Sequence, residues 1–182
     1  VEVEIVGRKA SDAILDYVRD EEIDLVVIGT HGRRGWRRGV LGSVAEAVAR
    51  RASCPVLTVR PLDAPGEGEW PPSRVLLAID VNPYETEAPS FAARWAARLA
   101  QAYDAPLDIV AVTGPGRGAM AGPAEEALER TQSREALGAL ANALRAETDS
   151  DLPGTVMVRT GDPAGAVRAV AEEVRTHLLV VG

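Results

Sequence analysis

The sequence is short of several kinds of residue, and each shortage narrows what the protein can be. Cys54 is the single cysteine among 182 residues, so no disulfide can form within the chain and a reducing, cytoplasmic location is expected. Aromatic residues make up 4% of the chain, so its core must be built from Val, Leu, Ile and Ala. No apolar run comes near the ~20 residues that cross a bilayer, so no membrane segment is expected. The net charge of −7 argues against nucleic-acid binding, which needs a basic surface.

The sequence also lacks a recognisable catalytic set. No Ser-His-Asp or Cys-His arrangement, no cluster with metal-ligand spacing and no pair of catalytic carboxylates stands out. We therefore expect a protein that is not an efficient enzyme and that supports slow turnover at most.

Short apolar runs alternate with segments of helical spacing along the chain. Strands are expected at 1–6, 24–29, 55–60, 74–80, 106–112, 155–160 and 177–182. Helices are expected at 10–21, 43–51 and 123–147, within 89–103, and from Pro163, where Asp162 is suited to be the N-cap. Regular strand–helix alternation predicts an α/β fold with a parallel sheet and helices on both faces.

A linker and an apparent internal repeat divide the chain. Residues 61–73 (PLDAPGEGEWPPS) are rich in Pro, Gly and acid and are expected to be a linker. Segments 7–29 and 161–182 share a turn glycine, a helix of similar length and an apolar strand that ends in glycine. The matched lengths favour a true repeat. Residues 1–60 are then the C-terminal part of one unit, and 74–182 are the N-terminal two-thirds of a second.

The glycine-rich stretch at 29–43 (GTHGRRGWRRGVLGS) follows an apolar strand and leads into a helix. Loops in this position bind ligands in α/β sheets, because glycine lets backbone N–H groups approach a phosphate and the helix start adds positive charge. Ser43 followed by Glu46 reads as a capping box, so the Ser43 hydroxyl can cap the helix, contact a phosphate, or do both in turn. The stretch fits neither the P-loop pattern nor GxGxxG.

The spacing Gly29, two residues, Gly32, nine residues, Gly42-Ser43 resembles the nucleotide-binding motif of the universal stress protein family, G-2x-G-9x-G-[S/T]. The flanks DLVVIGTHGRRG and LGSVAEAVARRASCPVLTVR agree with the resemblance, which covers nearly the whole chain apart from the linker. It implies a flavodoxin-like (Rossmann-like) three-layer αβα fold in tandem units. It also implies pairing of units through their last strands, as a homodimer or a pseudo-dimer.

The resemblance further implies that ATP, alone or with Mg²⁺, is the cofactor. The residues that it places against the phosphates and ribose are Gly29, Gly32, Gly42 and Ser43, with Thr30 and His31 inside the motif. Asp80 matches the position that holds the adenosine, and Val112 one that can line the adenine pocket. The family often continues after that Asp with Gly-Ser, whereas Val81-Asn82-Pro83 stands here, which puts nucleotide binding by the second unit in doubt. Four arginines (Arg33, Arg34, Arg37 and Arg38) and Trp36 lie in the loop, either near the ligand or as a solvated surface.

Several alternatives remain open at this point. The first unit has the loop but no first strand, and the second has the first strand but no loop. Either the two complete one site, within a chain or between two, or the sequence is an excerpt of a longer tandem protein. The main functional hypothesis is an ATP-binding stress-response regulator. The alternatives are a nucleotide-independent dimerisation or interaction module, such as the soluble part of a transporter, and, third, a nucleotide-transforming α/β enzyme.

Overall fold

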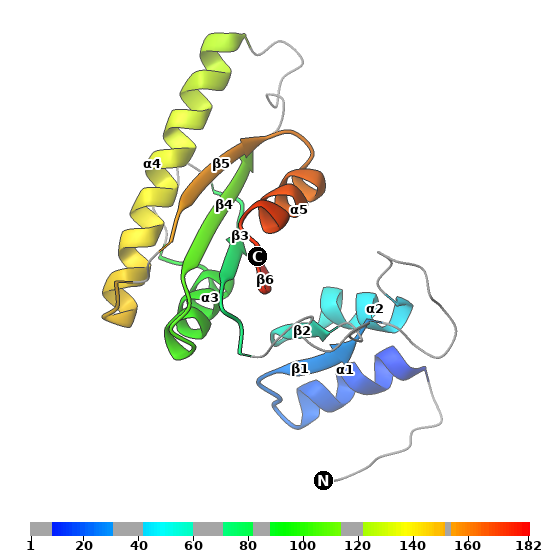
Figure 1. The fold of residues 1–182 in the computed structure, drawn as a ribbon. Helices are drawn as coiled ribbons and strands as arrows, with labels where there is room; N and C mark the ends of the chain where they lie inside the picture. The colour runs from blue at the N-terminus through cyan, green and yellow to red at the C-terminus, as the bar shows by residue number, and fades with distance from the viewer. Residues whose placement is uncertain (1–8, 31–41, 60–70, 82–87, 114–121, 152–153) are drawn as a thin grey trace. The chain divides into compact units, whose positions relative to one another are not determined.

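The computed structural model describes residues 9–30, 42–59, 71–81, 88–113, 122–151 and 154–182. It divides into two compact units, Val1–Glu67 and Gly68–Gly182 (Figure 1). The division falls within 61–73, and because residues 60–70 lie outside the described ranges, the linker stays a prediction. The strand expected at 1–6 also lies outside them.

Unit 1 holds two strands and two helices in its described part. The elements in chain order are α1 (Ala10–Asp20), β1 (Val26–Gly29), α2 (Ser43–Arg51) and β2 (Val56–Val59). The strands pair in parallel, in a register that runs from Val26 opposite Val56 to Gly29 opposite Val59. The two helices pack against each other and bury Val18 and Val48.

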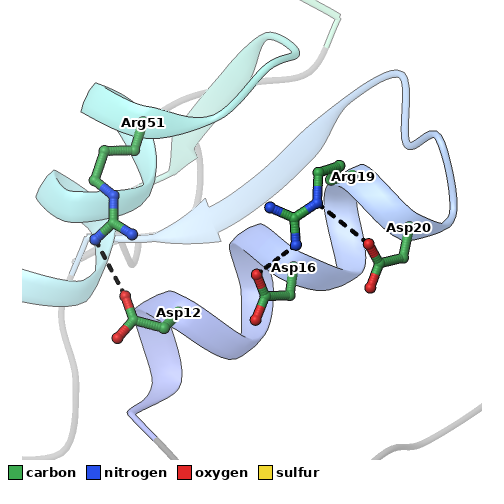
Figure 2. A network of polar contacts seen from close by, with 5 residues as sticks. All are labelled: Asp12, Asp16, Arg19, Asp20 and Arg51. Atoms are coloured by element: carbon green, nitrogen blue, oxygen red, sulfur yellow. Dashed lines mark hydrogen bonds and ion pairs between the residues drawn. The ribbon is translucent and has the colours of Figure 1, made fainter.

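Ion pairs on α1 and α2 add to this packing at the surface (Figure 2). Arg51 Nη1 lies 3.1 Å from Asp12 Oδ1 and so joins the end of α2 to the first turn of α1. Within α1, Arg19 bonds Asp16 at 2.6 Å and Asp20 at 3.3 Å. The pKa of Arg19 is raised, mainly by its hydrogen bond to Asp16 and next by its hydrogen bond to Asp20. All of these groups are solvated, so each pair contributes little to stability.

Unit 2 is a doubly wound α/β domain. Its elements are β3 (Val75–Ala78), α3 (Phe91–Ala102), β4 (Leu107–Thr113), α4 (Pro123–Thr148), β5 (Val156–Thr160), α5 (Pro163–Glu173) and β6 (Leu178–Val181). All four strands are parallel, in the order β5-β4-β3-β6. The chain therefore builds outward from β3 to β5 and then returns to the other side of β3.

Helices cover both faces of the unit 2 sheet, which confirms the predicted fold class (Figure 1). On one face Val170 of α5 packs in a cluster with Leu76, Val110 and Met157. On the other face lie α3 and α4, which contact each other and the central strands. Every residue of β3 is buried, as are the first five of β4, and this burial on both faces explains why all of these residues except Asp108 are apolar.

One charged residue lies within this core, at the amino end of β4. Asp108 is fully buried and accepts hydrogen bonds from Arg74 Nη1 at 2.8 Å and from the backbone N–H of Thr155 at 2.8 Å. The three residues stand at the starts of β3, β4 and β5, so one carboxylate ties three strands together at the amino edge of the sheet.

The two segments of the predicted repeat end their helices in the same way. Glu22 after α1 and Arg175 after α5 both adopt left-handed backbone angles, with φ of 50° and 54°. The following N–H groups reach back to the helix: Ile23 to the Val18 carbonyl at 3.0 Å, and Thr176 to the Ala171 carbonyl at 2.9 Å. Two βαβ units share such geometry by fold alone, so descent from one duplicated unit stays a prediction.

Candidate nucleotide-binding loop

The structure places the predicted site residues in two separate groups. Gly29, Thr30, Gly42 and Ser43 belong to unit 1, whereas Asp80 and Val112 belong to unit 2. His31 and Gly32 lie outside the described residues, as do the loop residues Arg33, Arg34, Trp36, Arg37 and Arg38.

In unit 1, backbone hydrogen bonds fix both ends of the glycine loop at one point. Thr30, which follows β1, is 8% exposed, and its N–H donates to the Val59 carbonyl at 2.9 Å, which extends the β1–β2 pairing by one step. The Thr30 carbonyl in turn accepts the Gly42 N–H at 2.9 Å. Residues 31–41 are therefore spanned by two anchors that are bonded to each other, directly beyond the carboxyl end of β1.

Gly42 is required at its position by space rather than by backbone angle. Its φ of −60° and ψ of 145° are extended values that any residue adopts. A Cβ added there would lie 3.0 Å from the Thr30 carbonyl oxygen, which is tighter than side-chain carbons normally approach. Gly29 is different, because no atom of the described residues lies within 4 Å of a Cβ placed on it. Of these two motif glycines, only Gly42 is therefore explained by the packing of the described residues.

Ser43 does not form the capping box that its sequence suggested. Helix α2 begins at Ser43 with Gly42 as the N-cap, and no side chain caps it. The Glu46 N–H bonds the Gly42 carbonyl at 2.8 Å, while the Glu46 carboxylate pairs with Arg50 at 3.2 Å. The capping-box interpretation is wrong because the helix starts one residue earlier than that motif requires. The Ser43 residue is exposed, and across the described ranges its hydroxyl takes part in no hydrogen bond.

The arrangement suits an anion. The first turn of a helix carries N–H groups without intrahelical partners and a partial positive charge. Here that turn follows a parallel strand, begins with a glycine that leaves room beside a backbone carbonyl, and carries an exposed hydroxyl at Ser43. The backbone N–H groups and the Ser43 hydroxyl can donate hydrogen bonds to a phosphate, and the Ser43 hydroxyl can also accept one from a ribose hydroxyl.

In unit 2, Asp80 and Val112 lie at the carboxyl edge of two neighbouring strands. Asp80 is exposed two residues beyond β3, and Val112 is half-buried near the end of β4. The Ile79 N–H still donates to the Val110 carbonyl at 3.0 Å, so the segments that follow β3 and β4 remain paired up to this edge. On the other side of β3, β6 ends and Gly182 follows; a Cβ there would overlap the Ala92 Cβ in the first turn of α3. Doubly wound sheets bind ligands at this point, where the strand order reverses.

Some features of these sites were accessible to sequence reasoning and one was not. Asp162 caps α5 as predicted, accepting the Gly165 N–H at 2.7 Å, with Pro163 in the first turn. The anchoring role of Thr30 was missed, because its partners Val59 and Gly42 are distant in sequence and no local pattern marks them. In the described ranges, no group of three or more His, Cys, Asp or Glu side chains is placed to hold a metal ion. Within the same ranges, no helix is both long and apolar enough to span a membrane.

Comparison with known proteins gives one consistent answer. The sequence model of the universal stress protein family matches residues 1–60 and 72–182, which is nearly the whole chain. The chain belongs to the universal stress protein family. Its relatives include a universal stress protein of Methanocaldococcus jannaschii, 38% identical over 60 residues that make up 33% of this chain and 35% of that protein. Another, from Synechocystis, is 43% identical over 60 residues, which are 33% of this chain and 21% of the relative. The matched parts thus span about a third or less of these universal stress proteins.

One solved structure of the family supports this fold, and a second is similar over part of the chain. A universal stress protein from Archaeoglobus fulgidus aligns with 93% of this chain and 53% of its own, with a TM-score of 0.58 and 19% identity. Another structure from the same organism, solved in complex with dAMP, aligns with 60% of this chain and 79% of its own, with a TM-score of 0.43 and 18% identity.

Proposed function

We propose that this universal stress protein binds an adenine nucleotide at the glycine loop of unit 1 and acts as a cytoplasmic stress-response regulator. The observation that carries the proposal is the hydrogen bond between Gly42 and Thr30, which holds both ends of the loop beside the first turn of α2. ATP, alone or with Mg²⁺, is the nucleotide that the motif favours. Asp80 and Val112 are the residues of unit 2 that the family resemblance assigns to the adenosine part of a nucleotide. Pairing as a homodimer or pseudo-dimer would follow the family.

Catalysis is not the expected purpose of this loop. The Gly42 and Thr30 anchors and the α2 N-terminus supply neutral hydrogen-bonding groups, which bind and orient a phosphate but do not move its protons. We expect at most slow ATP hydrolysis, measured as phosphate release over hours rather than seconds.

The direct test is calorimetric titration of the 182-residue chain with ATP, with and without Mg²⁺, and with dAMP. Replacing Gly42 by Ala should weaken binding by about tenfold or more, because the added carbon pushes on the Thr30 carbonyl that anchors the loop. Gly42→Val should abolish binding. The matched control is Gly138→Ala in α4, where nothing lies within 4 Å of the new carbon and affinity should stay unchanged.

A second candidate function, a nucleotide-independent interaction module, is favoured by the bare face of the unit 1 sheet. Leu25, Val27 and Val59 are 39%, 59% and 42% exposed, and strand alternation and register place them on one face. If ATP and dAMP both fail to bind at millimolar concentration while the chain self-associates in sedimentation, the interaction role replaces the nucleotide role.

A further inference from the structure

A histidine and a serine meet where the chain enters unit 2. Ser73 lies just before β3 and His177 just before β6. The Ser73 backbone N–H donates to His177 Nδ1 at 3.2 Å, and the Ser73 Oγ lies 2.9 Å from the same nitrogen. The backbone of the same segment continues the contact, because the N–H groups of His177 and Leu178 both reach the Arg74 carbonyl, at 3.1 and 3.2 Å. Immediately upstream of Ser73, Pro72 is buried.

The chemistry of this contact depends on one proton. A backbone N–H can only donate, so Nδ1 must present a lone pair, and the neutral ring carries its proton on Nε2. A protonated ring has a hydrogen on both nitrogens and can accept nothing. The Ser73 hydroxyl can rotate and accept from Nδ1–H, but the Ser73 backbone N–H cannot and is left without this partner. In the neutral state, the backbone N–H and the hydroxyl of Ser73 both donate to His177 Nδ1. After protonation of His177, only one hydrogen bond remains, from Nδ1–H to the Ser73 hydroxyl.

The charged groups around His177 lie on three elements. Arg74 at the start of β3 is paired with Asp108 of β4. Glu172 and Glu173 lie at the end of α5, Arg175 lies two residues beyond it, and Arg159 donates a hydrogen bond to Glu173 at 2.9 Å. In the part of the chain that the structure describes, the hydrogen bonds to the His177 ring come from Ser73 and none from a carboxylate. A charge on the ring thus gains no ion pair that would offset the lost backbone bond.

We propose that His177 and Ser73 form a proton-operated latch that fixes the entry of the chain into unit 2 when the ring is neutral and loosens it when the ring is charged. Histidine is the side chain that ordinarily changes charge between pH 5 and 8. The matching position in the predicted repeat is Asp24, so unit 1 carries a carboxylate where unit 2 carries the imidazole of His177.

Amide hydrogen exchange of Ser73, measured by NMR on the full 182-residue chain, tests the latch. After correction for the intrinsic pH dependence of exchange, the Ser73 amide should exchange about fivefold faster at pH 5.5 than at pH 7.5, the effect of one net hydrogen bond. In Ser73→Ala the change should be larger, since the hydroxyl that accepts from the charged ring is gone. In His177→Asp, which installs the residue of unit 1, the change should vanish.

The other histidine of the chain supplies the control. His31→Gln should keep the wild-type change, because His31 belongs to unit 1 and the latch to unit 2. A Ser73 amide that exchanges equally at both pH values in the wild-type chain would overturn the proposal. So would a His177→Asp variant that retains the pH dependence.

Discussion

Strands β1 and β6 occupy equivalent places in the predicted repeat, yet they expose opposite faces. When Gly29 is matched with Gly182, Val27 corresponds to Val180 and Ile28 to Val181. In β1, Val27 is 59% exposed and Ile28 half-buried; in β6, Val180 is half-buried and Val181 is 70% exposed. Because successive strand residues point to opposite faces, the bare face in unit 1 is the covered face in unit 2.

The helices around each strand account for this reversal. Unit 1 contributes α1 and α2, which pack against each other, whereas in unit 2 α3 packs against β6. Among the described residues, the strand face that is more exposed in one unit therefore corresponds to the face that is more buried in the other. The comparison teaches that an apolar run predicts a strand buried on both faces only where both helical layers are present.

The largest effect is expected from removing the buried charge of Asp108 in unit 2, which has no equivalent among the described residues of unit 1. Asp108→Ala should lower the free energy of unfolding of unit 2 by about 3 kcal/mol, because the Thr155 N–H loses its buried acceptor and the half-exposed Arg74 loses its ion-pair partner. Urea unfolding followed by Trp95 fluorescence, with Trp36 and Trp70 replaced by Phe, measures this. The matched control Asp12→Ala removes the exposed pair with Arg51 and should cost at most about 1 kcal/mol, read from circular dichroism. Equal losses in the two variants would contradict the burial assigned to Asp108.

A matched leucine pair tests the covered and bare faces directly. Leu178 is 9% exposed and Leu25, at the corresponding position of unit 1, is 39% exposed. Leu178→Ala should destabilise unit 2 by about 2–3 kcal/mol, near the low end for buried leucines, and Leu25→Ala should destabilise unit 1 by under about 1 kcal/mol. Hydrogen exchange of the amides in β1 and β6 reports the two units separately. If Leu25→Ala proves as costly as Leu178→Ala, the bare face is covered in solution by another surface.

The smallest effect concerns the left-handed residue that ends both helices of the predicted repeat, Glu22 after α1 and Arg175 after α5. We expect a gain of about 0.5 kcal/mol in the stability of each unit from Glu22→Gly and from Arg175→Gly. Glycine adopts the left-handed backbone angles without the strain of about 1 kcal/mol that other residues carry. Part of this gain is lost because glycine has more conformational entropy in the unfolded chain. Thermal unfolding measures both shifts. Arg168→Gly, inside α5, is the control and should be destabilising by up to about 1 kcal/mol. Opposite signs for Glu22→Gly and Arg175→Gly would show that the two helix ends are not equivalent.

Most of the fold follows from sequence pattern, and the part that does not depends on distant partners. Within the described residues, the strands and helices lie where apolar runs and helical spacing predicted them, and Asp162 with Pro163 marks the start of α5 correctly. The strand expected at 1–6 stays a prediction. The helix at 43–51 was predicted with the correct bounds, but its cap was misjudged, because a capping box and a glycine cap one residue earlier share the same local sequence. Asp108 was visible as a charge within an apolar strand, but its partner lies 34 residues away, so its role could not be deduced.

The closed frame of the glycine loop has a consequence for how binding preference can change. The Thr30–Gly42 hydrogen bond joins the end of β1 to the start of α2 through backbone groups, so it does not depend on the side chains of the residues between them. The entropy cost of closing a loop grows slowly with its length, by ~0.6 kcal/mol for each doubling. Residues can therefore be gained, lost or exchanged between these two anchors with little effect on the folding of the unit. Selection can then alter what the protein recognises almost independently of how stably it folds.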